Sequence, residues 1–568
     1  MMSKKKIATI DGIPIEIEGE KNILELIRKA GIELPTFCYH SELSVFGSCR
    51  LCMFEDERGR LDAACSAQPW PGMVIKTNTR RLRKYRKMIM ELLLANHWGD
   101  CTVCENSGDC KLQDLASRFH IEKVRFPRTE QKIEIDSSSP CITTDDSKCI
   151  LCGDCVRMCD ETQGVGAIDF AYRGPKMKIS TAFGEPMSES GCVGCGQCVT
   201  VCPTGALMVR NDTSRLYKDL DDPNSKVIVQ VAPAVRTAIG ERFGLADGEN
   251  TMGKIVAALR LIGFDEVFDT STGADLTVME EAAELAGRLK SGKSLPLLTS
   301  CCPAWIQYCE NNYPEMLPHI SSCRSPMQML ASVLKEHNVN SDKRVIQVAV
   351  MPCTAKKFEA MRNEFKKDGK PNVDYVITTQ ELVQMIREAG VVFTELEAET
   401  VDIPFGATTG AGVIFGVTGG VTEAVLRRIY SDKTVTGLRL IALEGIRGLE
   451  GIKETTINID GRELKIAIVS GLGNAREIME RVKSGEKFDF IEIMACPGGC
   501  VNGGGQPTAF GKTIDARGKG LYAVDNSKNF KHSERSPVVM ELYDGMLKEK
   551  SHDLLHVTYG EKQKKSKK

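Results

Sequence analysis

Four cysteines in three separated stretches have the types and surroundings of cluster ligands. Cys302 lies in TSCCPAW, Cys353 in MPCTAKKFE, and Cys496 and Cys500 in ACPGGCVNGGGQP. None of these stretches has the paired CxxC layout of a zinc ribbon, because three residues separate Cys496 from Cys500. Thiolates gathered from distant loops are typical ligands of a cubane iron–sulfur cluster. A fifth thiol, Cys301, precedes a ligand candidate and indicates chemistry beyond cluster binding.

The middle of the chain carries two copies of the pattern C-x2-C-x2-C-x3-C, which is typical of bacterial two-cluster ferredoxins. In those proteins the fourth cysteine of each copy binds the other cluster. The sequence therefore predicts two [4Fe–4S] clusters with crossed ligand sets. The first set is Cys149, Cys152, Cys155 and Cys202, and the second is Cys192, Cys195, Cys198 and Cys159. A short hairpin is expected between the copies, at residues 167–172 and 176–181.

The most N-terminal cysteines follow two local structure signals. Residues 7–17 alternate around Asp11-Gly12 and predict a hairpin, and Asn22 can cap a short helix after it. The cysteines that follow are Cys38, Cys49, Cys52 and Cys65. This order predicts a β-grasp domain with a [2Fe–2S] cluster, and a zinc site is the alternative.

A further set mixes one histidine with three cysteines. An amphipathic helix is expected over residues 81–96, and the pattern H-x3-C-x2-C-x5-C follows it. The members of this set are His97, Cys101, Cys104 and Cys110. An imidazole in place of a thiolate makes a [4Fe–4S] cluster less negative and changes its potential.

Composition limits the class of protein. The chain has 568 residues, 23 cysteines and a formal net charge of −2. This charge does not favour nucleic acid or an anionic membrane as a partner, although lysines collect at residues 562–568. Neither a signal peptide nor an apolar run of about 18 residues is present. We therefore expect a cytoplasmic protein whose cysteines bind metal and do not form disulfides.

Strand-like and helical segments alternate beyond residue 225, which indicates an α/β domain with a mostly parallel sheet. The strand-like runs lie at residues 227–233, 344–352, 465–471 and 490–496. Loops after the last three can converge on one site, because parallel strands end at the same edge. The glycine-rich run 406–420 lacks a nucleotide-binding pattern and predicts close backbone packing near that site. No NAD or flavin site is expected in this chain.

The C-terminal segment, residues 515–568, differs from the α/β region in its pattern of apolar residues. Its apolar residues follow helical spacing at Val539, Leu542, Tyr543, Met546 and Leu547. We expect an extended strap that packs on the core.

Together these motifs resemble the [FeFe]-hydrogenases. The three cysteine loops match the signatures of that family, and the upstream modules match its larger members in order and spacing. The first modules also resemble the large iron–sulfur subunit of respiratory NADH dehydrogenase. The resemblance implies a multidomain α/β and α+β fold. Its parts are a plant-ferredoxin-like [2Fe–2S] domain (1–80), a [4Fe–4S] domain with one histidine and three cysteine ligands (81–125), a two-[4Fe–4S] ferredoxin domain (139–212), a catalytic domain (225–514) and a small-subunit-like segment (515–568).

The resemblance also implies the cofactors. They are one [2Fe–2S] cluster, three accessory [4Fe–4S] clusters and an H-cluster, in which a [4Fe–4S] unit joins a two-iron subcluster bearing CO, cyanide and a dithiolate amine. The implied H-cluster ligands are Cys302, Cys353, Cys496 and Cys500, of which Cys500 bridges the two parts. The implied pocket residues are Ala232, Pro233, Met351, Lys356 and Met494. The common clostridial pattern has Ser at the position of Ala234, so one hydrogen bond to the cluster is expected to be missing.

A proton path is the third implication of the resemblance. Cys301 would exchange a proton with the bridging amine, and Glu281, Glu284, Ser321 and Arg288 would connect it to solvent. Taken alone, the two glutamates and Arg288 would be a solvated face of a helix at 275–289. The remaining cysteines, Cys141, Cys309 and Cys323, are expected to be small buried apolar residues.

The implied activity is reversible interconversion of H2 with two protons and two electrons. Ferredoxin alone could be the electron partner of a monomer. Flavin- and NAD(P)H-binding partner subunits could instead form a complex, which could use electron bifurcation; Ala234 and the fused C-terminal segment favour this complex. Maturation enzymes would insert the two-iron subcluster.

Two alternatives come from other functional classes. A pure electron-relay subunit would not need the three C-terminal cysteine loops. An iron–sulfur scaffold or hydrogen-sensing relative tends to lack the thiol that matches Cys301.

Overall fold

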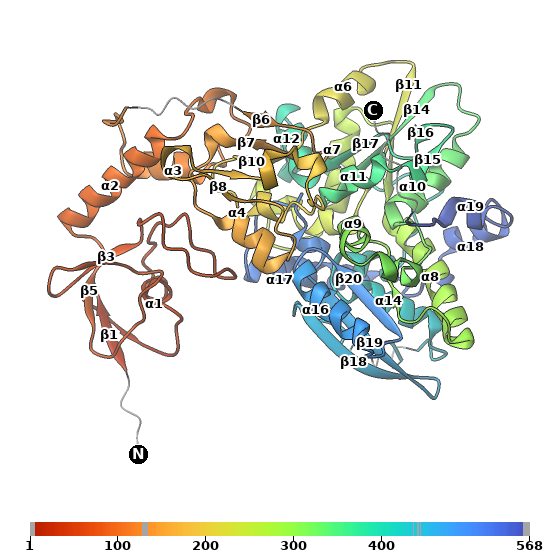
Figure 1. The fold of residues 1–568 in the computed structure, drawn as a ribbon. Coiled ribbons are helices and arrows are strands. Elements are labelled where there is room, and N and C mark those ends of the chain that lie inside the picture. Colours follow the sequence, from red (N-terminus) through yellow and green to blue (C-terminus); the bar gives the residue numbers. More distant parts are fainter. Residues whose placement is uncertain (1–5, 128–133, 435–436, 440–441, 443–444, 561–568) are drawn as a thin grey trace.

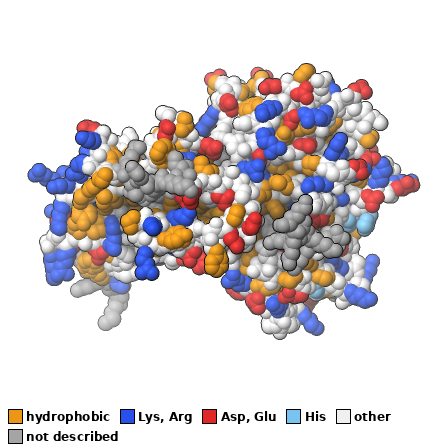
Figure 2. All heavy atoms as spheres, turned by 45° about the horizontal axis from the view of Figure 1, so that its top comes forward, with side chains coloured by type: hydrophobic (Ala, Val, Ile, Leu, Met, Phe, Trp, Pro, Cys, Tyr) orange, Lys and Arg blue, Asp and Glu red, His pale blue; other side chains and the backbone are white. Residues whose placement is uncertain are grey.

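The computed structural model describes residues 6–127, 134–434, 437–439, 442 and 445–560, so the lysine-rich residues 562–568 lie outside it. Figure 1 shows small N-terminal modules in a row beside a larger α/β body. On the face in Figure 2, acidic and basic side chains are interspersed over the larger body. Within the described ranges, no helix is long and apolar enough to cross a membrane.

The first module contains the predicted hairpin and helix. Strands β1 (Ile7–Ile10) and β2 (Ile13–Glu16) pair antiparallel across Asp11-Gly12, whose φ values are 49° and 87°. Two positive φ values are those of a type I′ turn, which Asp-Gly favours. Helix α1 (Ile23–Lys29) begins at Asn22, whose side chain accepts a hydrogen bond from the Glu25 amide at 3.0 Å.

A mixed five-stranded sheet in the order β2-β1-β5-β3-β4 completes this module. The added strands are β3 (Met53–Asp56), β4 (Leu61–Ala63) and β5 (Val74–Lys76). The apolar side of α1 is fully buried in the same cluster as the sheet. Cys52 and Cys65 lie in this cluster, whereas Cys38 and Cys49 pack in a neighbouring one.

Helix α2 (Arg80–Ala95) leads out of the first module and confirms the predicted amphipathic helix. It begins at Thr79, whose hydroxyl accepts a hydrogen bond from the Leu82 amide at 3.2 Å. The chain then turns through the histidine and cysteines into α3 (Lys111–Arg118).

The next module repeats one local backbone for its two cysteine runs. Gly153 and Gly196 have φ values of 76° and 72° and precede the short helices α4 (Asp154–Arg157) and α5 (Gln197–Thr200). Between them, β8 (Asp169–Ala171) and β9 (Lys178–Ser180) form the predicted hairpin. A second small sheet contains β6 (Ile135–Asp136), β7 (Ile142–Asp145) and β10 (Leu207–Val209).

Two four-stranded sheets form the larger body. The first, in the order β12-β11-β14-β17, is fully parallel and contains β12 (Glu266–Asp269), β11 (Ser225–Val231), β14 (Arg344–Met351) and β17 (Tyr375–Thr378). The second, in the order β13-β20-β19-β18, contains β13 (Leu297–Leu298), β20 (Phe490–Met494), β19 (Arg462–Ser470) and β18 (Ile452–Ile459). Only β18 runs antiparallel in this sheet. The prediction of a mostly parallel α/β region is confirmed.

Helices surround these sheets (Figure 1). They include α6 (Thr213–Leu220), α7 (Met252–Ile262), α8 (Ser271–Ser291), α9 (Pro303–Asn312), α10 (Pro326–His337), α11 (Ala355–Met361), α12 (Thr379–Glu388), α13 (Gly410–Val413), α14 (Gly420–Ile429) and α16 (Leu472–Lys483). Helix α8 contains the predicted segment 275–289 and extends beyond it at both ends.

The set of strands that deliver loops to the site differs from the prediction. The segments after β14 and β20 carry Cys353 and Cys496 as expected, but the segment after β19 does not line the site cavity. Ser470, at the end of β19, instead accepts a hydrogen bond from the Gly498 amide at 3.2 Å. Strand β13 precedes Cys301 and has only two residues, which is too short for a recognisable pattern of apolar residues in the sequence.

The C-terminal segment is helical and not an extended strap. It contains α17 (Lys512–Ser527), α18 (Pro537–Asp544) and α19 (Ser551–Leu555), and α17 crosses the boundary expected at residue 515. Helix α18 ends before Met546 and Leu547, although Leu547 is still buried against the core. The predicted helix was therefore too long at its C-terminal end.

Candidate active site

One cavity at the carboxyl ends of β11, β14 and β20 brings together the predicted catalytic-domain residues. The predicted ligands and pocket residues that line it are Cys302, Cys353, Cys496, Cys500, Ala232, Pro233, Met351, Lys356 and Met494. Cys301 lines it as well. Most of the wall is sulfur and apolar side chain, so Lys356 is the main polar group that faces inward.

Glycines make the cavity wall possible, because backbone approaches backbone too closely for side chains. A Cβ atom on Gly499, whose φ is 96°, would lie 2.5 Å from the Thr418 amide nitrogen. A Cβ atom on Gly412 would overlap the Ser271 carbonyl oxygen. This confirms the prediction of close packing for run 406–420. The result is a rigid cradle around the thiols.

The donor set fits a multi-iron cluster. Four thiols reach one apolar cavity from three loops, and the Sγ atom of Cys302 accepts a hydrogen bond from the Ala495 amide at 3.4 Å. In the described part of the chain, no three His, Cys, Asp or Glu side chains are close enough to hold a single metal ion. Ligands of a cubane bind different iron atoms, so their sulfur atoms stand further apart than the ligands of one ion.

Lys356 is oriented by a residue that the sequence analysis missed. Its Nζ atom donates hydrogen bonds to Glu359 Oε2 at 2.9 Å and to the Cys301 carbonyl oxygen at 3.1 Å. Burial alone would lower the pKa of Lys356, but the negative charge of Glu359 raises it, so the ammonium form persists. Ser325 donates to the same Glu359 oxygen at 2.9 Å. The i, i+3 spacing of Lys356 and Glu359 on α11 was the available sequence signal.

Cys301 is half-buried and lines the cavity, and Glu281 is fully buried. Burial raises the pKa of the Cys301 thiol well above its usual range, and the nearby Glu281 raises it further. Burial also raises the pKa of Glu281 to about 8, with the charge of Glu284 adding to the shift. Neither carboxylate oxygen of Glu281 has a hydrogen-bond partner within the described residues. Both groups therefore hold a proton at neutral pH.

The rest of the predicted proton path is joined by hydrogen bonds. The Ser321 hydroxyl donates to Glu284 Oε2 at 2.9 Å, and Arg288 Nη2 donates to Glu284 Oε1 at 2.5 Å. Ser321 is fully buried, whereas the side chains of Glu284 and Arg288 are each 15% exposed. The predicted residues thus run from the cavity toward the surface along α8.

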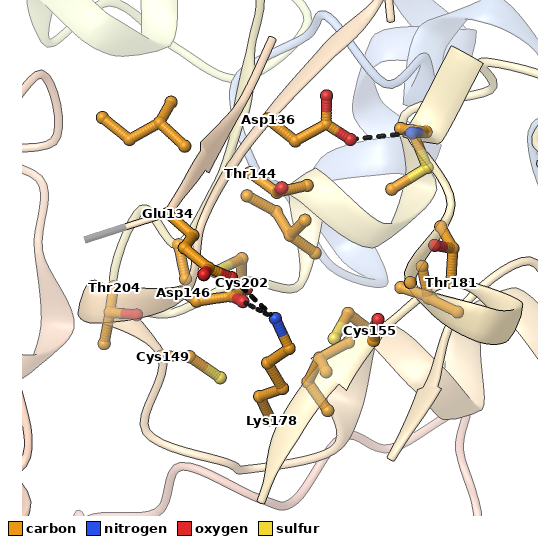
Figure 3. Close-up of a pocket in the computed structure, with 18 of the residues that line it drawn as sticks. Glu134, Asp136, Thr144, Asp146, Cys149, Cys155, Lys178, Thr181, Cys202 and Thr204 are labelled. Carbon is orange, nitrogen blue, oxygen red and sulfur yellow. Dashed lines mark hydrogen bonds and ion pairs between the residues drawn. The ribbon is translucent and has the colours of Figure 1, made fainter. Parts of the chain in front are cut away.

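The crossed ligand set of the ferredoxin-like module also lines one cavity. Cys149, Cys152, Cys155 and Cys202 surround a space of about 620 Å³. Figure 3 shows Cys149, Cys155 and Cys202 in this cavity, with Lys178 forming ion pairs to Glu134 and Asp146. Cys202 comes from the second cysteine run, so the structure brings the crossed set together.

The second crossed set lies against the catalytic cavity. Cys159, Cys192 and Cys198 pack in one apolar cluster. The neighbouring Cys195 packs with Cys302 and Cys353 of the catalytic domain. A Cβ atom on Gly504 would overlap the Cys195 carbonyl oxygen, and the Thr354 hydroxyl donates to the Gly194 carbonyl at 2.7 Å. The two cysteine sets are therefore close neighbours.

The N-terminal cysteines form two neighbouring pairs. The Cys49 amide donates to Cys38 Sγ at 3.3 Å, and the thiols of Cys52 and Cys65 hydrogen-bond to each other. The thiols of Cys38 and Cys49 are likewise hydrogen-bonded. Two pairs of thiols suit a [2Fe–2S] cluster, in which four cysteines serve two irons.

His97 has the environment of a metal-binding histidine. It is buried, and its Nδ1 atom lies 2.9 Å from the Lys148 carbonyl oxygen. A carbonyl can only accept, so Nδ1 carries the proton and Nε2 has the lone pair that a metal needs. Cys110, from the same predicted set, lies 3.9 Å from the Pro203 carbonyl oxygen, next to Cys202.

Members of the cysteine sets lie in three successive apolar clusters. Cys38, Cys110 and Cys152, from three different sets, share one apolar cluster. The cluster of the ferredoxin-like module and that of the catalytic cavity continue the series. By contrast Cys141, Cys309 and Cys323 are buried with 1%, 0% and 0% exposure, which confirms the prediction for them.

Five known family models match the chain in sequence order. Residues 6–80 match the 2Fe-2S iron-sulfur cluster binding domain, and 86–125 match the NADH-ubiquinone oxidoreductase-G iron-sulfur binding region. Residues 148–206 match the 4Fe-4S dicluster domain. Residues 225–504 match the iron only hydrogenase large subunit, C-terminal domain, and 511–562 match the iron hydrogenase small subunit.

Similar proteins extend over nearly the whole chain. NADP-reducing hydrogenase subunit HndD of Solidesulfovibrio fructosivorans is 41% identical over 98% of this chain and 99% of its own length. Iron hydrogenase 1 of Clostridium pasteurianum is 36% identical over 98% and 100%. The solved structure of a variant of apo [FeFe]-hydrogenase HydA1 from Chlamydomonas reinhardtii is 40% identical, covers 61% of this chain and 98% of that one, and has a TM-score of 0.55. The chain therefore belongs to the iron-only, or [FeFe], hydrogenase family and is an iron hydrogenase with iron–sulfur domains.

Proposed function

We propose that the chain is the H2-converting subunit of an NAD(P)-linked complex, in which electrons travel along the cysteine sets to the catalytic cavity. The observation that carries this proposal is that members of the cysteine sets occupy three successive apolar clusters. Cys38, Cys110 and Cys152 share the first, Cys155 and Cys198 the second, and Cys195 and Cys353 the third. The match over nearly the whole length to a relative named as an NADP-reducing hydrogenase subunit supports the assembly.

We propose the domains and ligand sets that the sequence predicts. The first module is a β-grasp domain with one [2Fe–2S] cluster, followed by the [4Fe–4S] domain with one histidine and three cysteine ligands and by a two-[4Fe–4S] domain. Cys302, Cys353, Cys496 and Cys500 bind the [4Fe–4S] part of the H-cluster, and the apolar cavity holds its two-iron part. When bound, this cofactor supplies the site at which H2 is formed and cleaved.

The residues of the cavity then have separate roles. Lys356, held by Glu359, directs an ammonium group toward the cofactor and can donate hydrogen bonds to it. Met351 and Met494 are polarizable and fill the space around the cofactor, which excludes water. Cys301 carries the proton, and Glu281 exchanges it with Ser321 and Glu284. Arg288 positions Glu284 through its ion pair.

Electron entry through the N-terminal module is the testable part of the partner proposal. Cys65→Ser should lower H2-dependent reduction of NADP+ by the assembled complex about tenfold or more, because one ligand of the entry cluster is lost. H2 oxidation with methyl viologen, a small dye that can reduce or oxidise clusters nearer the site, should stay within about twofold. The assay should be run with ferredoxin alone, NADP+ alone and both together, with copurified partner subunits and without them.

The matched control is Cys309→Ser, which changes a buried thiol outside every cysteine set. Equal loss of both activities in Cys65→Ser would contradict entry at this module. Full activity with ferredoxin and none with NADP+ in any assembly would favour the second candidate, a stand-alone ferredoxin hydrogenase. That candidate is supported by the match over full length to Iron hydrogenase 1, whose name specifies no subunit.

His97→Ala should remove or convert one accessory cluster. The imidazole is buried, and its tautomer is set by the Lys148 carbonyl, as for a ligand. We expect a lower iron content and the loss or change of one electron paramagnetic resonance signal in the reduced protein. His120→Ala is the control, since His120 lies outside the predicted set. An unchanged iron content and spectrum in His97→Ala would refute ligation.

A further inference from the structure

A series of polar side chains continues from Glu284 into the C-terminal segment. Ser322 donates to Glu284 Oε2 from its amide at 3.0 Å and from its hydroxyl at 3.2 Å. The same hydroxyl lies 2.9 Å from Nδ1 of His556, and Nε2 of His556 lies 3.1 Å from Glu280 Oε2. Hydrogen-bond distances therefore link Glu284 to Glu280 through a histidine that lies 234 residues beyond Ser322 in the chain.

The position of His556 is fixed by backbone pairing. The Val557 amide donates to the Ser322 carbonyl at 2.7 Å, and the Arg324 amide donates to the Leu555 carbonyl at 2.8 Å. Arg324 Nε also donates to the His556 carbonyl at 2.9 Å. These bonds pair the short loop after Ser321 with the chain around His556 in an isolated antiparallel bridge between Cys323 and His556, so the backbone that carries the imidazole is held in place.

Arg288 cannot pass a proton from Glu284 to solvent. Its guanidinium binds Glu284 Oε1 and also donates to the carbonyl oxygens of Ser294, His319 and Ile320. A guanidinium keeps its protons in proteins and has no acceptor site, so no proton passes through it. A serine hydroxyl and an imidazole each have a donor and an acceptor, and both can pass a proton on.

Exposure rises between Glu281 and the series. Glu281 is 1% exposed, whereas the side chains of Glu284, His556 and Glu280 are 15%, 16% and 17% exposed. Burial alone would raise the pKa of Glu280, but the hydrogen bonds from His556 and Tyr543 hold it below its ordinary value, so it remains an ionised acceptor. The other charged or titratable groups that face His556 are Arg324, Glu284 through Ser322, and His552, whose ring stacks on it with centroids 5.2 Å apart.

We propose that His556 is a proton-transfer residue that connects Glu284 to solvent, so that the C-terminal segment supplies part of the proton path. This inference rests on the proposed roles of Glu281 and Glu284. In H2 oxidation, the Glu284 proton moves to the Ser322 oxygen as the Ser322 hydroxyl proton moves to His556 Nδ1. The Nε2 proton then moves to the Glu280 carboxylate and from there to water. One proton is released, no electron moves, and exchange of ring protons with water restores the first tautomer.

The decisive experiment measures hydrogen isotopes under H2 in D2O, with the matured full-length protein and no electron acceptor. If protons leave the site slowly, cleaved H2 recombines with at most one deuteron, so HD exceeds D2 among the first labelled products. If they leave quickly, both positions exchange and D2 is released. His556→Gln should lower the initial D2:HD ratio about three- to tenfold, since glutamine can hydrogen-bond but does not titrate. The effect is smaller than for an isolated acid–base group because Glu284 is itself partly exposed.

Two further measurements separate relay from a structural role. In His556→Ala, added imidazole should restore the ratio, because a free base can occupy the space left by the ring. Selective labelling of histidine allows the His556 ring nitrogens to be observed by NMR without any turnover. Their signals should change in Glu280→Gln and in Glu284→Gln, as expected for groups joined by hydrogen bonds.

Lys550→Gln is the matched control in the same segment, because Lys550 pairs with Glu336, which is not a member of the series. It should leave the ratio unchanged, and a loss equal to that of His556→Gln would mean that the segment acts only by packing. A normal ratio in His556→Gln, with a lowered ratio in Glu284→Gln, would overturn the role of His556 alone. A normal ratio in both would overturn the path through Glu284 as well.

Discussion

Cys301→Ala should abolish nearly all H2 turnover and leave the iron content of the protein unchanged. The thiol lines the cavity, is held protonated by its surroundings, and lies next to Cys302, a proposed cluster ligand. Removing a positioned proton donor costs about 10²- to 10⁴-fold in rate. H2 evolution with reduced viologen measures the loss, and infrared bands of CO and cyanide show whether the cofactor is present.

Cys309→Ala is the control for this substitution. Cys309 is fully buried on α9 and is not among the residues that line the cavity. It should keep activity within about threefold, as a small change in packing would predict. Activity of Cys301→Ala at the level of Cys309→Ala, with normal cofactor bands, would remove Cys301 from the proton path.

Glu281→Gln should reduce turnover by a similar factor, about 10²-fold or more. Glutamine has nearly the same shape, and the carboxyl has no hydrogen bond to lose within the described residues, so the loss reports on the proton and not on packing. Glu281→Asp keeps the acid and shortens the side chain by one carbon, and it should be intermediate. Normal turnover in Glu281→Gln would place the path elsewhere.

The pH dependence of H2 evolution follows from the same residue. The pKa of Glu281 is raised to about 8, so the group is mostly protonated below that pH and loses its proton above it. H2 evolution consumes the protonated form, so the rate should fall as pH rises through about 8 in the parent protein. The carboxylic acid band in the infrared should disappear over the same range and should be absent from Glu281→Gln.

Local patterns in the sequence predicted most of what is local in the structure. The hairpin at Asp11-Gly12, the cap at Asn22 and the helix before His97 depend on neighbouring residues, and all three are present. Cysteine spacing predicted which thiols would meet, because residues two or three apart are held together by one turn of backbone. Cys202 could be paired with the first run only because the crossed pattern is a recurrent one.

Contacts between distant segments were not predictable in this way. No spacing rule links His556 to Ser322 or β13 to the cavity, because both contacts depend on how helices and strands pack in the tertiary structure. The apolar pattern predicted a helix that continues through Leu547, but α18 ends at Asp544. Leu547 is still buried in the core, although its backbone is not helical. Glu359 was overlooked because an acidic residue near a lysine is common on exposed helices and becomes informative only once both are known to be buried.

The placement of α8 separates the proposed proton route from the proposed electron route. The cysteine sets approach the cavity from the side of Cys353 and Thr354, where the ferredoxin-like module packs. Helix α8 and the C-terminal helices α18 and α19 lie on the opposite side of the larger body, away from the N-terminal modules (Figure 1). A large protein docked on those modules would leave the acid–base side open to water. Assembly with electron partners and exchange with the aqueous phase can therefore occur at the same time on one molecule.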